Sequence, residues 1–450
     1  MAFDADSHAA LGALLDHARK AGAGSAEASF SARESVSAEV RCGELEGMER
    51  EESRSVALRA FIGKQQAAAS STDLSSAGLK ALAERVVAMA KAAPEDPYCG
   101  LLDAKYRASG PFEDLEQADT ARPSAEQLRD MALACEAATF VSPEISREKS
   151  GGAGASSDYN FFVYATSDGF EGSDASTTYS LGAQPIAERD GKMERDYEYR
   201  TKRFLADLPD AAAIGRTAGE RALARLGPRK LESSRAPVIF ANRRAGSLLS
   251  PLIGGISGNS IARGTSFLKN KLGQRVFAPG FELKEDPFIK RAIGSMAFDG
   301  EGCAVKRNLL VDDGVITMWL LNSATARQLK LEPTGHATSG HGGPPGIAAA
   351  NLAVKPGKDD LAGLMKNAGK GLYVTEMFSP ALNMNTGDWS VGVSGFWFEH
   401  GEIAYPVSEV TVAGALLDIY ARMIPGADLD NRGALEIPSM LIDDLAIGGV

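Results

Sequence analysis

The sequence predicts an α+β fold in three parts. These are an N-terminal domain of helices and antiparallel sheet, a middle region of a helix followed by β-hairpins, and a C-terminal domain of curved, mainly antiparallel sheet with flanking helices. Runs of apolar residues with a period of two, which indicate strands, are joined by short turns that contain glycine. Runs with helical spacing precede and follow them. A chain of 450 residues has room for two or three domains, which we place at 1–110, 111–230 and 231–450.

The N-terminal domain follows from its changes of period. Ser7 can cap a first amphipathic helix. Between residues 25 and 71 the apolar residues alternate, which indicates strands of an antiparallel sheet. Ser75 or Ser76 opens a second helix, which ends before Pro94.

The middle region begins with a capping-box pattern. Ser124 and Gln127 have the spacing that starts a helix. A glycine-rich stretch at 150–154 lacks the lysine and hydroxyl pair of a nucleotide loop, so we interpret it as a plain loop. Strands are predicted at 159–166, 177–184 and 193–202, and a helix at 210–226.

The C-terminal domain opens with a short strand at 237–241. An Asp313-Gly314 turn joins two strands within 305–321, and the second is apolar on both faces, which predicts a central position in a sheet. A further hairpin turns at His400-Gly401, after which Ser408 is expected to cap a long helix. Apolar residues that fall on one face of that helix are Val412, Leu416, Tyr420, Met423 and Ile424. A closing strand follows at 440–447.

Charge and cysteine usage exclude some classes of function. Lysine and arginine number 48 against 59 acidic residues, a formal net charge of −11, and no basic block occurs, which argues against direct nucleic-acid binding. The four cysteines have no metal-ligand or redox spacing, which indicates reduced thiols. Neither a secretory signal nor an apolar run of membrane-spanning length is apparent, so we expect a cytoplasmic protein without a membrane segment.

Several motifs of the last half of the chain resemble a known family. They are Thr386-Gly387-Asp388-Trp389-Ser390, Gly395-Phe396-Trp397-Phe398-Glu399-His400-Gly401-Glu402-Ile403, and Phe298-Asp299-Gly300-Glu301-Gly302. On these motifs the chain resembles the TldD/PmbA family of metallopeptidases, also described as modulators of DNA gyrase, and within it the PmbA (TldE) branch. The resemblance is weaker before about Pro237.

The resemblance implies a zinc site that this chain lacks. In the peptidase branch, the first helix of the C-terminal domain carries His-Glu-x-x-x-His, and a cysteine near the C-terminus completes the metal site. Here the matching positions read Ser250, Pro251, Leu252, Ile253, Gly254 and Gly255. No His, Cys, Asp or Glu occurs between Ala245 and Gln274, and 431–436 holds no cysteine. We therefore expect no metal and no catalytic residue of its own, and Pro251 is expected to kink or rebuild the helix if it lies in its interior.

Other candidate sites have weaker support. His336 and His341 share a loop, residues 334–346, that is rich in glycine and has two prolines; they could bind zinc only with help from elsewhere, so we favour a mobile loop. Asp299 and Glu301 suggest a turn rather than an acid/base pair, because glycines surround them. Asp388 is expected to bond to backbone amides near Gly387.

The leading hypothesis is a subunit of a two-chain peptidase acting on peptides or unfolded proteins, with the zinc held by a TldD-type partner. Strands bearing Gly387, Asp388, Ser390 and Gly395 could pair with an extended peptide. Two alternatives stay open: an interaction protein that binds a toxin, gyrase or peptide without hydrolysis, and a hydrolase using the loop with the two histidines. Alone, the chain could form a homodimer.

Overall fold

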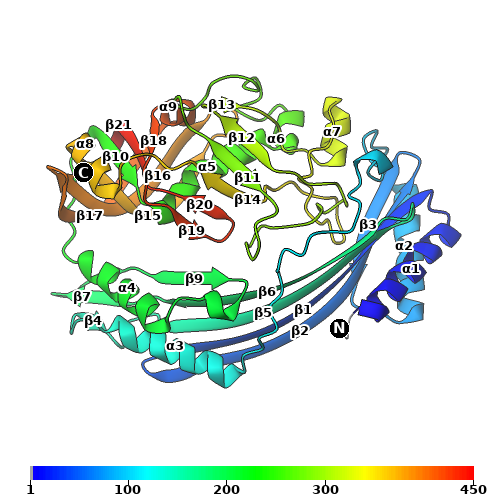
Figure 1. Ribbon diagram of the computed structural model, residues 1–450, viewed down its shortest axis with the longest axis horizontal. Coiled ribbons are helices and arrows are strands. Elements are labelled where there is room, and N and C mark those ends of the chain that lie inside the picture. The colour runs from blue at the N-terminus through cyan, green and yellow to red at the C-terminus, as the bar shows by residue number, and fades with distance from the viewer. Residues whose placement is uncertain (1–3, 450) are drawn as a thin grey trace.

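The first half of the chain builds one long, curved antiparallel sheet, in the computed structural model that describes residues 4–449. Its strands lie in the order β3-β2-β1-β5-β6-β9. Their bounds are Ser25–Arg41 (β1), Glu44–Ile62 (β2), Gln65–Ser71 (β3), Ala153–Thr166 (β5), Glu171–Ala183 (β6) and Glu198–Lys202 (β9). β1 pairs with β2 on one side and with β5 on the other. One sheet therefore contains strands from both the region 1–110 and the region 111–230 that the sequence analysis separates. Figure 1 shows it curving beneath the C-terminal half.

Helices cover one face of this sheet at its two ends. They are α1 (Asp4–Ala21) and α2 (Ser76–Ala92) at one end, and α3 (Ala125–Thr139) and α4 (Ala211–Ala224) at the other. The first pair buries Phe30 and its neighbours, and the second pair buries Ala38 and Val40 of the same strand. Because strand side chains alternate, the odd-numbered residues of β1 lie on the opposite, polar face. That face looks toward the C-terminal half (Figure 1).

Capping residues were predicted with mixed success. Ser75 accepts a hydrogen bond from the N–H of Gly78, and the capping box of Ser124 and Gln127 is present, so both helix starts are confirmed. The first helix, however, begins at Asp4, and Ser7 is a buried residue inside it rather than its cap. A serine three residues into a helix resembles a cap in the sequence because the same side chain suits both positions.

The strand predicted at 193–202 is divided between two sheets. A small sheet contains β4 (Ile145–Ser146), β7 (Ile186–Arg189) and β8 (Lys192–Arg195), and β9 belongs to the large sheet. The break falls at Asp196 and Tyr197, because the buried Asp196 carboxylate forms an ion pair with Arg243 of the C-terminal half. The glycine-rich stretch at 150–154 is partly strand, since β5 already begins at Ala153.

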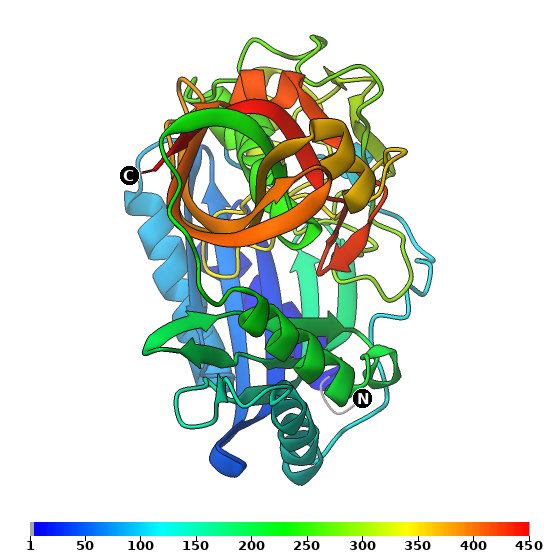
Figure 2. The same ribbon diagram turned by 90° about the vertical axis from the view of Figure 1, so that its left-hand side faces the viewer.

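The C-terminal half contains a closed barrel. Its sheet has the order β10-β15-β16-β17-β21-β18, and β21 also pairs with β10, which closes the ring. The bounds are Ser234–Phe240 (β10), Lys370–Leu382 (β15), Asp388–Glu399 (β16), Glu402–Ala415 (β17), Met423–Pro425 (β18) and Met440–Gly448 (β21). Only the β10–β15 pair is parallel, so the predicted curved, mainly antiparallel sheet is confirmed. Figure 2 shows this ring from its open end.

A second sheet and five helices pack around the barrel. The sheet has the order β13-β12-β11-β14-β20-β19. Its strands are β11 (Leu283–Asp286), β12 (Asn308–Asp312), β13 (Val315–Ile316), β14 (Asn351–Val354), β19 (Asp430–Arg432) and β20 (Leu435–Ile437). The helices are α5 (Asn242–Ile256), α6 (Gly258–Ala262), α7 (Ser323–Leu329), α8 (Leu361–Ala368) and α9 (Leu416–Ala421).

Two strand and helix predictions in this half are wrong. The strand expected at the centre of a sheet is β13, which has two residues and lies at an edge; Leu320 and Leu321 are apolar because the domain core buries them. The helix expected to start at Ser408 is strand until Ala415, and only α9 is helical. Val410 and Val412 fit the alternation of a strand as well as a helical face, and in the barrel they pair with β16.

The turns are predicted correctly. His400 and Gly401 have φ of 54° and 84° between β16 and β17, and Asp313 and Gly314 have φ of 44° and 80° between β12 and β13. Both pairs adopt the left-handed region that two-residue hairpin turns require. Among residues 4–449, no helix has the length and apolar character needed to cross a membrane.

Candidate functional site

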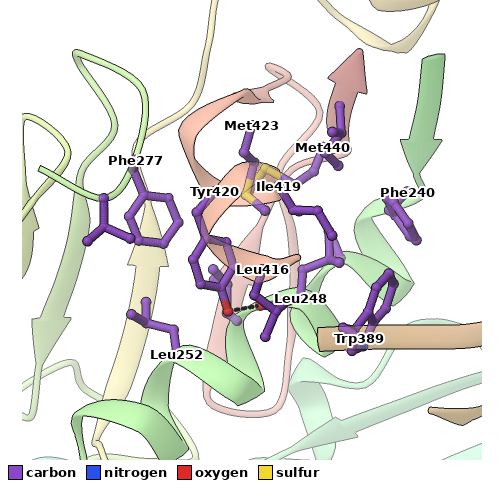
Figure 3. Close-up of a cluster of buried hydrophobic side chains, with 14 of the residues drawn as sticks. Phe240, Leu248, Leu252, Phe277, Trp389, Leu416, Ile419, Tyr420, Met423 and Met440 are labelled. Atoms are coloured by element: carbon purple, nitrogen blue, oxygen red, sulfur yellow. Dashed lines mark hydrogen bonds between the residues drawn. The ribbon is translucent and has the colours of Figure 1, made fainter. Parts of the chain in front are cut away.

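The helix at the position of the expected metal motif, α5, packs its buried face into the domain core. Leu248 and Leu252 are fully buried, and the Tyr420 hydroxyl donates a 2.9 Å hydrogen bond to the Leu248 carbonyl oxygen. The Tyr420 ring in turn stacks on Phe277, with ring centroids 4.6 Å apart. Figure 3 shows these side chains converging from α5, α9 and the loop before β11, beside Phe240, Trp389 and Met440 of the barrel strands. The core therefore fixes the orientation of α5.

The motif positions on α5 carry no group that binds a metal. Ser250 is exposed and its hydroxyl donates to the Gly246 carbonyl at 3.2 Å, and Pro251 is buried within the helix. The helix continues through this proline, so it is not broken there. The proline N lacks the hydrogen that would have bonded to the carbonyl of Ser247, an exposed residue. At Gly255, an added Cβ would lie 2.8 Å from the end of the Leu268 side chain, so a larger residue there would have to displace that side chain.

The structure brings the two halves of the expected metal motif together. The hairpin of β19 and β20, where the resemblance places a cysteine, lies against α5. The contact there is apolar: a Cβ built on Gly246 would lie 2.7 Å from the Leu435 side chain. Across residues 4–449, no three His, Cys, Asp or Glu side chains are grouped as a metal site requires. The residues at this position therefore do not fit the zinc ligand set of the peptidase branch.

A buried ion-pair network surrounds the start of α5, and the sequence analysis missed it. Both guanidinium nitrogens of Arg243 contact the Asp196 carboxylate, at 2.5 and 2.7 Å, and Arg225 lies 3.5 Å from the same group. Arg244 pairs with Glu376. Burial alone would raise the pKa of Asp196, but the hydrogen bonds and charge of Arg243 outweigh burial and lower it. The network joins the middle region to the C-terminal half.

A second group of charges lies beside the first. The Glu198 carboxylate is almost fully buried and contacts three arginines, including Arg432 of β19 at 3.1 Å and Arg200 at 3.0 Å. Arg432 also pairs with Asp430 at 2.7 Å. The contact between Glu198 and Arg432 joins residues 234 positions apart, which no sequence pattern signals.

The two histidines of the glycine-rich loop are structural. His336 is 3% exposed, and its ring nitrogens contact the Thr334 hydroxyl at 2.8 Å and the Glu285 carboxylate at 2.9 Å. His341 lies elsewhere in the loop, where its nitrogens contact the hydroxyls of Ser29 and Ser55 on the large sheet, at 2.9 and 2.8 Å. Each ring is therefore occupied by its own partners, and the loop is docked on the large sheet in place of the predicted mobile loop.

The Asp299–Glu301 segment is the predicted turn. Asp299 accepts hydrogen bonds from the backbone N–H groups of Glu301, Cys303 and Ala337, each at 2.9 Å. Burial, followed by the nearby Glu301 charge, raises the pKa of Asp299 to about 7. Glu301 accepts from the Ser323 amide and hydroxyl, both at 2.7 Å. The two carboxyl groups therefore bond to the protein itself.

The residues predicted to pair with a peptide have their backbone partners within the fold. β16 pairs with β15 on one side and β17 on the other, so Ser390 and Gly395 offer no free edge to an extended peptide. A Cβ on Gly395 would lie 1.9 Å from the Tyr373 carbonyl oxygen, so close strand packing explains this glycine. The backbone of Gly387 bonds to residues 383 and 416. The Asp388 carboxylate accepts from the Thr386 hydroxyl at 2.6 Å rather than from the expected backbone amides.

The order of three domains, with α5 at the start of the third, is shared with a family of metallopeptidases. Three models of this family match the chain: PmbA/TldA metallopeptidase domain 1 at residues 26–90, the central domain at 118–226 and the C-terminal domain at 233–449. The chain therefore belongs to the PmbA/TldD family.

Individual relatives agree with this assignment. The chain is 34% identical over 425 residues to metalloprotease PmbA of Escherichia coli O157:H7, which covers 94% of this chain and 92% of that protein. A crystal structure of a proposed modulator of DNA gyrase from Bacteroides thetaiotaomicron has a TM-score of 0.91 at 25% identity and full coverage of both chains. TldE from Thermococcus kodakarensis shares the fold, with a TM-score of 0.86 at 16% identity over 98% of this chain and 100% of that one. More distant relatives are named metalloprotease TldD homologs.

Proposed function

We propose that this chain is the PmbA/TldE-type subunit of a two-chain zinc peptidase that acts on peptides or unfolded proteins. In this assignment a TldD-type partner holds the zinc and performs the hydrolysis. The observation that carries the proposal is the composition of α5 and the hairpin that covers it. At the positions of the peptidase motif the chain places Ser250, Pro251 and Gly255, and Leu435 packs where a further ligand would be needed.

The surrounding residues support a role in stabilising a partner or substrate rather than in catalysis. Buried carboxylates near α5, such as Asp196 and Glu376, are neutralised by arginines and are not free to act as a general base. The acidic net charge of −11 also disfavours a direct contact with DNA. We place the subunit in the cytoplasm, where its free cysteines stay reduced, and a homodimer is the form we expect when the partner is absent.

Metal content and peptide cleavage test this proposal. Purified alone, the chain should hold much less than one zinc per molecule and cleave no unfolded protein such as casein. Addition of a TldD-type chain from the same genome should give a larger complex by size-exclusion chromatography and produce chelator-sensitive cleavage. Chelator-sensitive cleavage by the lone chain, at a rate similar to that of the complex, would contradict the proposal.

A binding protein without peptidase activity is the second candidate. The name of the Bacteroides structure, a proposed modulator of DNA gyrase, favours it. The two candidates differ in the partner's zinc site. If disabling the TldD-type motif abolishes function in cells, the subunit assignment stands; if function persists, or if no TldD-type chain co-purifies, the binding protein is the better account.

A further inference from the structure

A cavity of about 350 Å³ opens on the polar face of the large sheet, at the end covered on its other face by α3 and α4. The glycine-rich stretch 151–154 lines part of it. Tyr197 and Tyr199 form one wall, and their rings stack with centroids 6.0 Å apart. The Tyr197 ring also contacts the C-terminal half, since the guanidinium groups of Arg243 and Arg244 on α5 lie 5.4 and 5.1 Å from its centroid. The cavity therefore opens beside the start of α5.

Four residues that line the cavity belong to a row in register across five strands, and the fifth member of the row, Gly47, does not line it. In order, the row is Gly47 on β2, Glu39 on β1, Gly154 on β5, Gly182 on β6 and Tyr199 on β9. Gly154 and Gly182 thus lie between Glu39 and Tyr199, whose backbones are three strand spacings, or about 14 Å, apart. Gly154 has no side chain and open space above it, whereas the Tyr199 side chain already lies over Gly182, 2.7 Å from where a Cβ would stand. The row therefore forms a trough whose backbone floor is bare at Gly154 and closed by Tyr199, and we call it the glycine trough.

The charges that line the glycine trough are negative. Glu39 is exposed, and among the described residues it has no ion-pair partner. Glu46, at the same end, lies 3.6 Å from Arg41. A phosphate or other anion would meet these carboxylates, so the glycine-rich stretch is unsuited to the phosphate role that its composition suggests. A cation with an apolar stem matches the trough instead.

We propose that the glycine trough binds an arginine or lysine side chain of a peptide. The cationic head pairs with Glu39, and the aliphatic stem lies over Gly154 against the Tyr199 ring, which is 46% exposed. This inference rests on the proposed function, because it assigns a substrate feature to a peptidase subunit. It would give the two-chain enzyme a preference for peptides with a basic residue at one fixed distance from the cleaved bond.

Binding of a fluorescein-labelled peptide with a central arginine, measured by anisotropy with the full-length lone chain, tests the trough. A peptide with citrulline in place of arginine keeps the shape and removes the charge, and should bind about tenfold more weakly, as expected for loss of a charged hydrogen bond. Glu39→Gln should reduce binding of the arginine peptide by a similar factor and leave the citrulline peptide unaffected. Equal binding of the two peptides, or no binding of either, would overturn the proposal.

Substitution of the floor separates shape from charge. At Gly154 an added Cβ would have its nearest neighbours at 3.8 Å, so Gly154→Val should fold normally and fill the trough, reducing binding at least as much as Glu39→Gln. Gly47→Val is the matched control, because Gly47 lies in the same row on the other side of Glu39, where an added Cβ meets nothing within 4 Å. Unchanged binding by Gly154→Val with an unchanged urea midpoint would contradict the trough.

The same variants separate this inference from the proposed function. If the complex with the TldD-type chain cleaves arginine and citrulline peptides equally well, the trough is refuted while the subunit assignment stands. If the lone chain cleaves peptides by itself and Glu39→Gln still weakens arginine binding, the subunit assignment fails and the trough stands.

Discussion

Loss of the Arg243 side chain should destabilise the protein more than loss of any exposed arginine. Arg243 and Asp196 have side chains only 5% and 2% exposed, and they meet through two hydrogen bonds. Breaking a buried pair from one side costs about 3–5 kcal/mol, because the remaining charge is left without compensation. Arg225 stays 3.5 Å from Asp196 and offsets part of this cost. We therefore expect Arg243→Leu to lower the free energy of unfolding by about 3 kcal/mol.

Urea unfolding followed by two probes measures this effect. All three tryptophans, at 319, 389 and 397, lie in the C-terminal half, so their fluorescence reports on that half, whereas far-UV circular dichroism reports on the whole chain. Arg235→Leu is the matched control: its pair with Asp444 at 2.9 Å is more than half exposed, and its loss should cost below about 1 kcal/mol. Since Arg243 links the two halves, its loss should also separate the two transitions.

A double variant and the pH dependence complete the test. Asp196→Leu combined with Arg243→Leu removes both charges and should recover much of the loss. The pKa of Asp196 is lowered in the folded state, so its stabilisation is present above the unfolded value of 3.8 and is lost as pH falls below it. The wild-type advantage over Arg243→Leu should shrink in that range. Equal midpoints for Arg243→Leu and the wild type at pH 7, or a double variant as unstable as the summed single variants, would refute the reasoning.

Three further predictions concern single buried groups. Tyr420→Phe removes the hydrogen bond to the Leu248 carbonyl and should cost about 1 kcal/mol in urea unfolding; an unchanged midpoint would contradict that bond. Burial and Glu301 raise the pKa of Asp299 from 3.8 to about 7, so the stability that this group contributes to the fold is lost as pH rises between those values. In that range the free energy of unfolding of the wild type should therefore fall relative to that of Asp299→Asn. The same pH dependence of unfolding in both proteins would count against this prediction. At pH 8 a thiol reagent should label Cys42 alone rapidly, with the other three cysteines reacting only in urea; rapid labelling of more than one thiol would show that the buried assignments are wrong.

Local chemistry was predictable where the deciding atoms are close in sequence. The His400-Gly401 and Asp313-Gly314 turns follow from the need for positive φ, and the caps at Ser75 and Ser124 follow from a side chain that reaches an amide three residues on. Each of these features is fixed by residues within one turn of chain. Burial of Cys135 on the inner face of α3 follows from the helical spacing of its neighbours in the same way.

Features set by distant partners were not predictable. Asp196 lies in the break between β8 and β9, where its carboxylate binds Arg243, 47 residues later, and nothing near Asp196 signals that partner. The loop that carries His336 and His341 reads as mobile because it is rich in glycine and proline. Its order comes from Glu285 and from Ser29 and Ser55, which the fold brings to it from separate sheets.

The sequence could show that α5 lacks metal-binding side chains, but not how the space is used. In the structure, the side chains of Leu435 and Leu268 lie against glycines at 246 and 255, so a larger residue at either position would have to displace a leucine side chain. Tyr420 and Phe277 hold the opposite face of the helix in the core. A histidine reinstated at Gly255 would therefore have to displace the end of the Leu268 side chain. Under the proposed function this chain would act through surfaces other than α5, and the glycine trough is one such surface with a defined shape and charge.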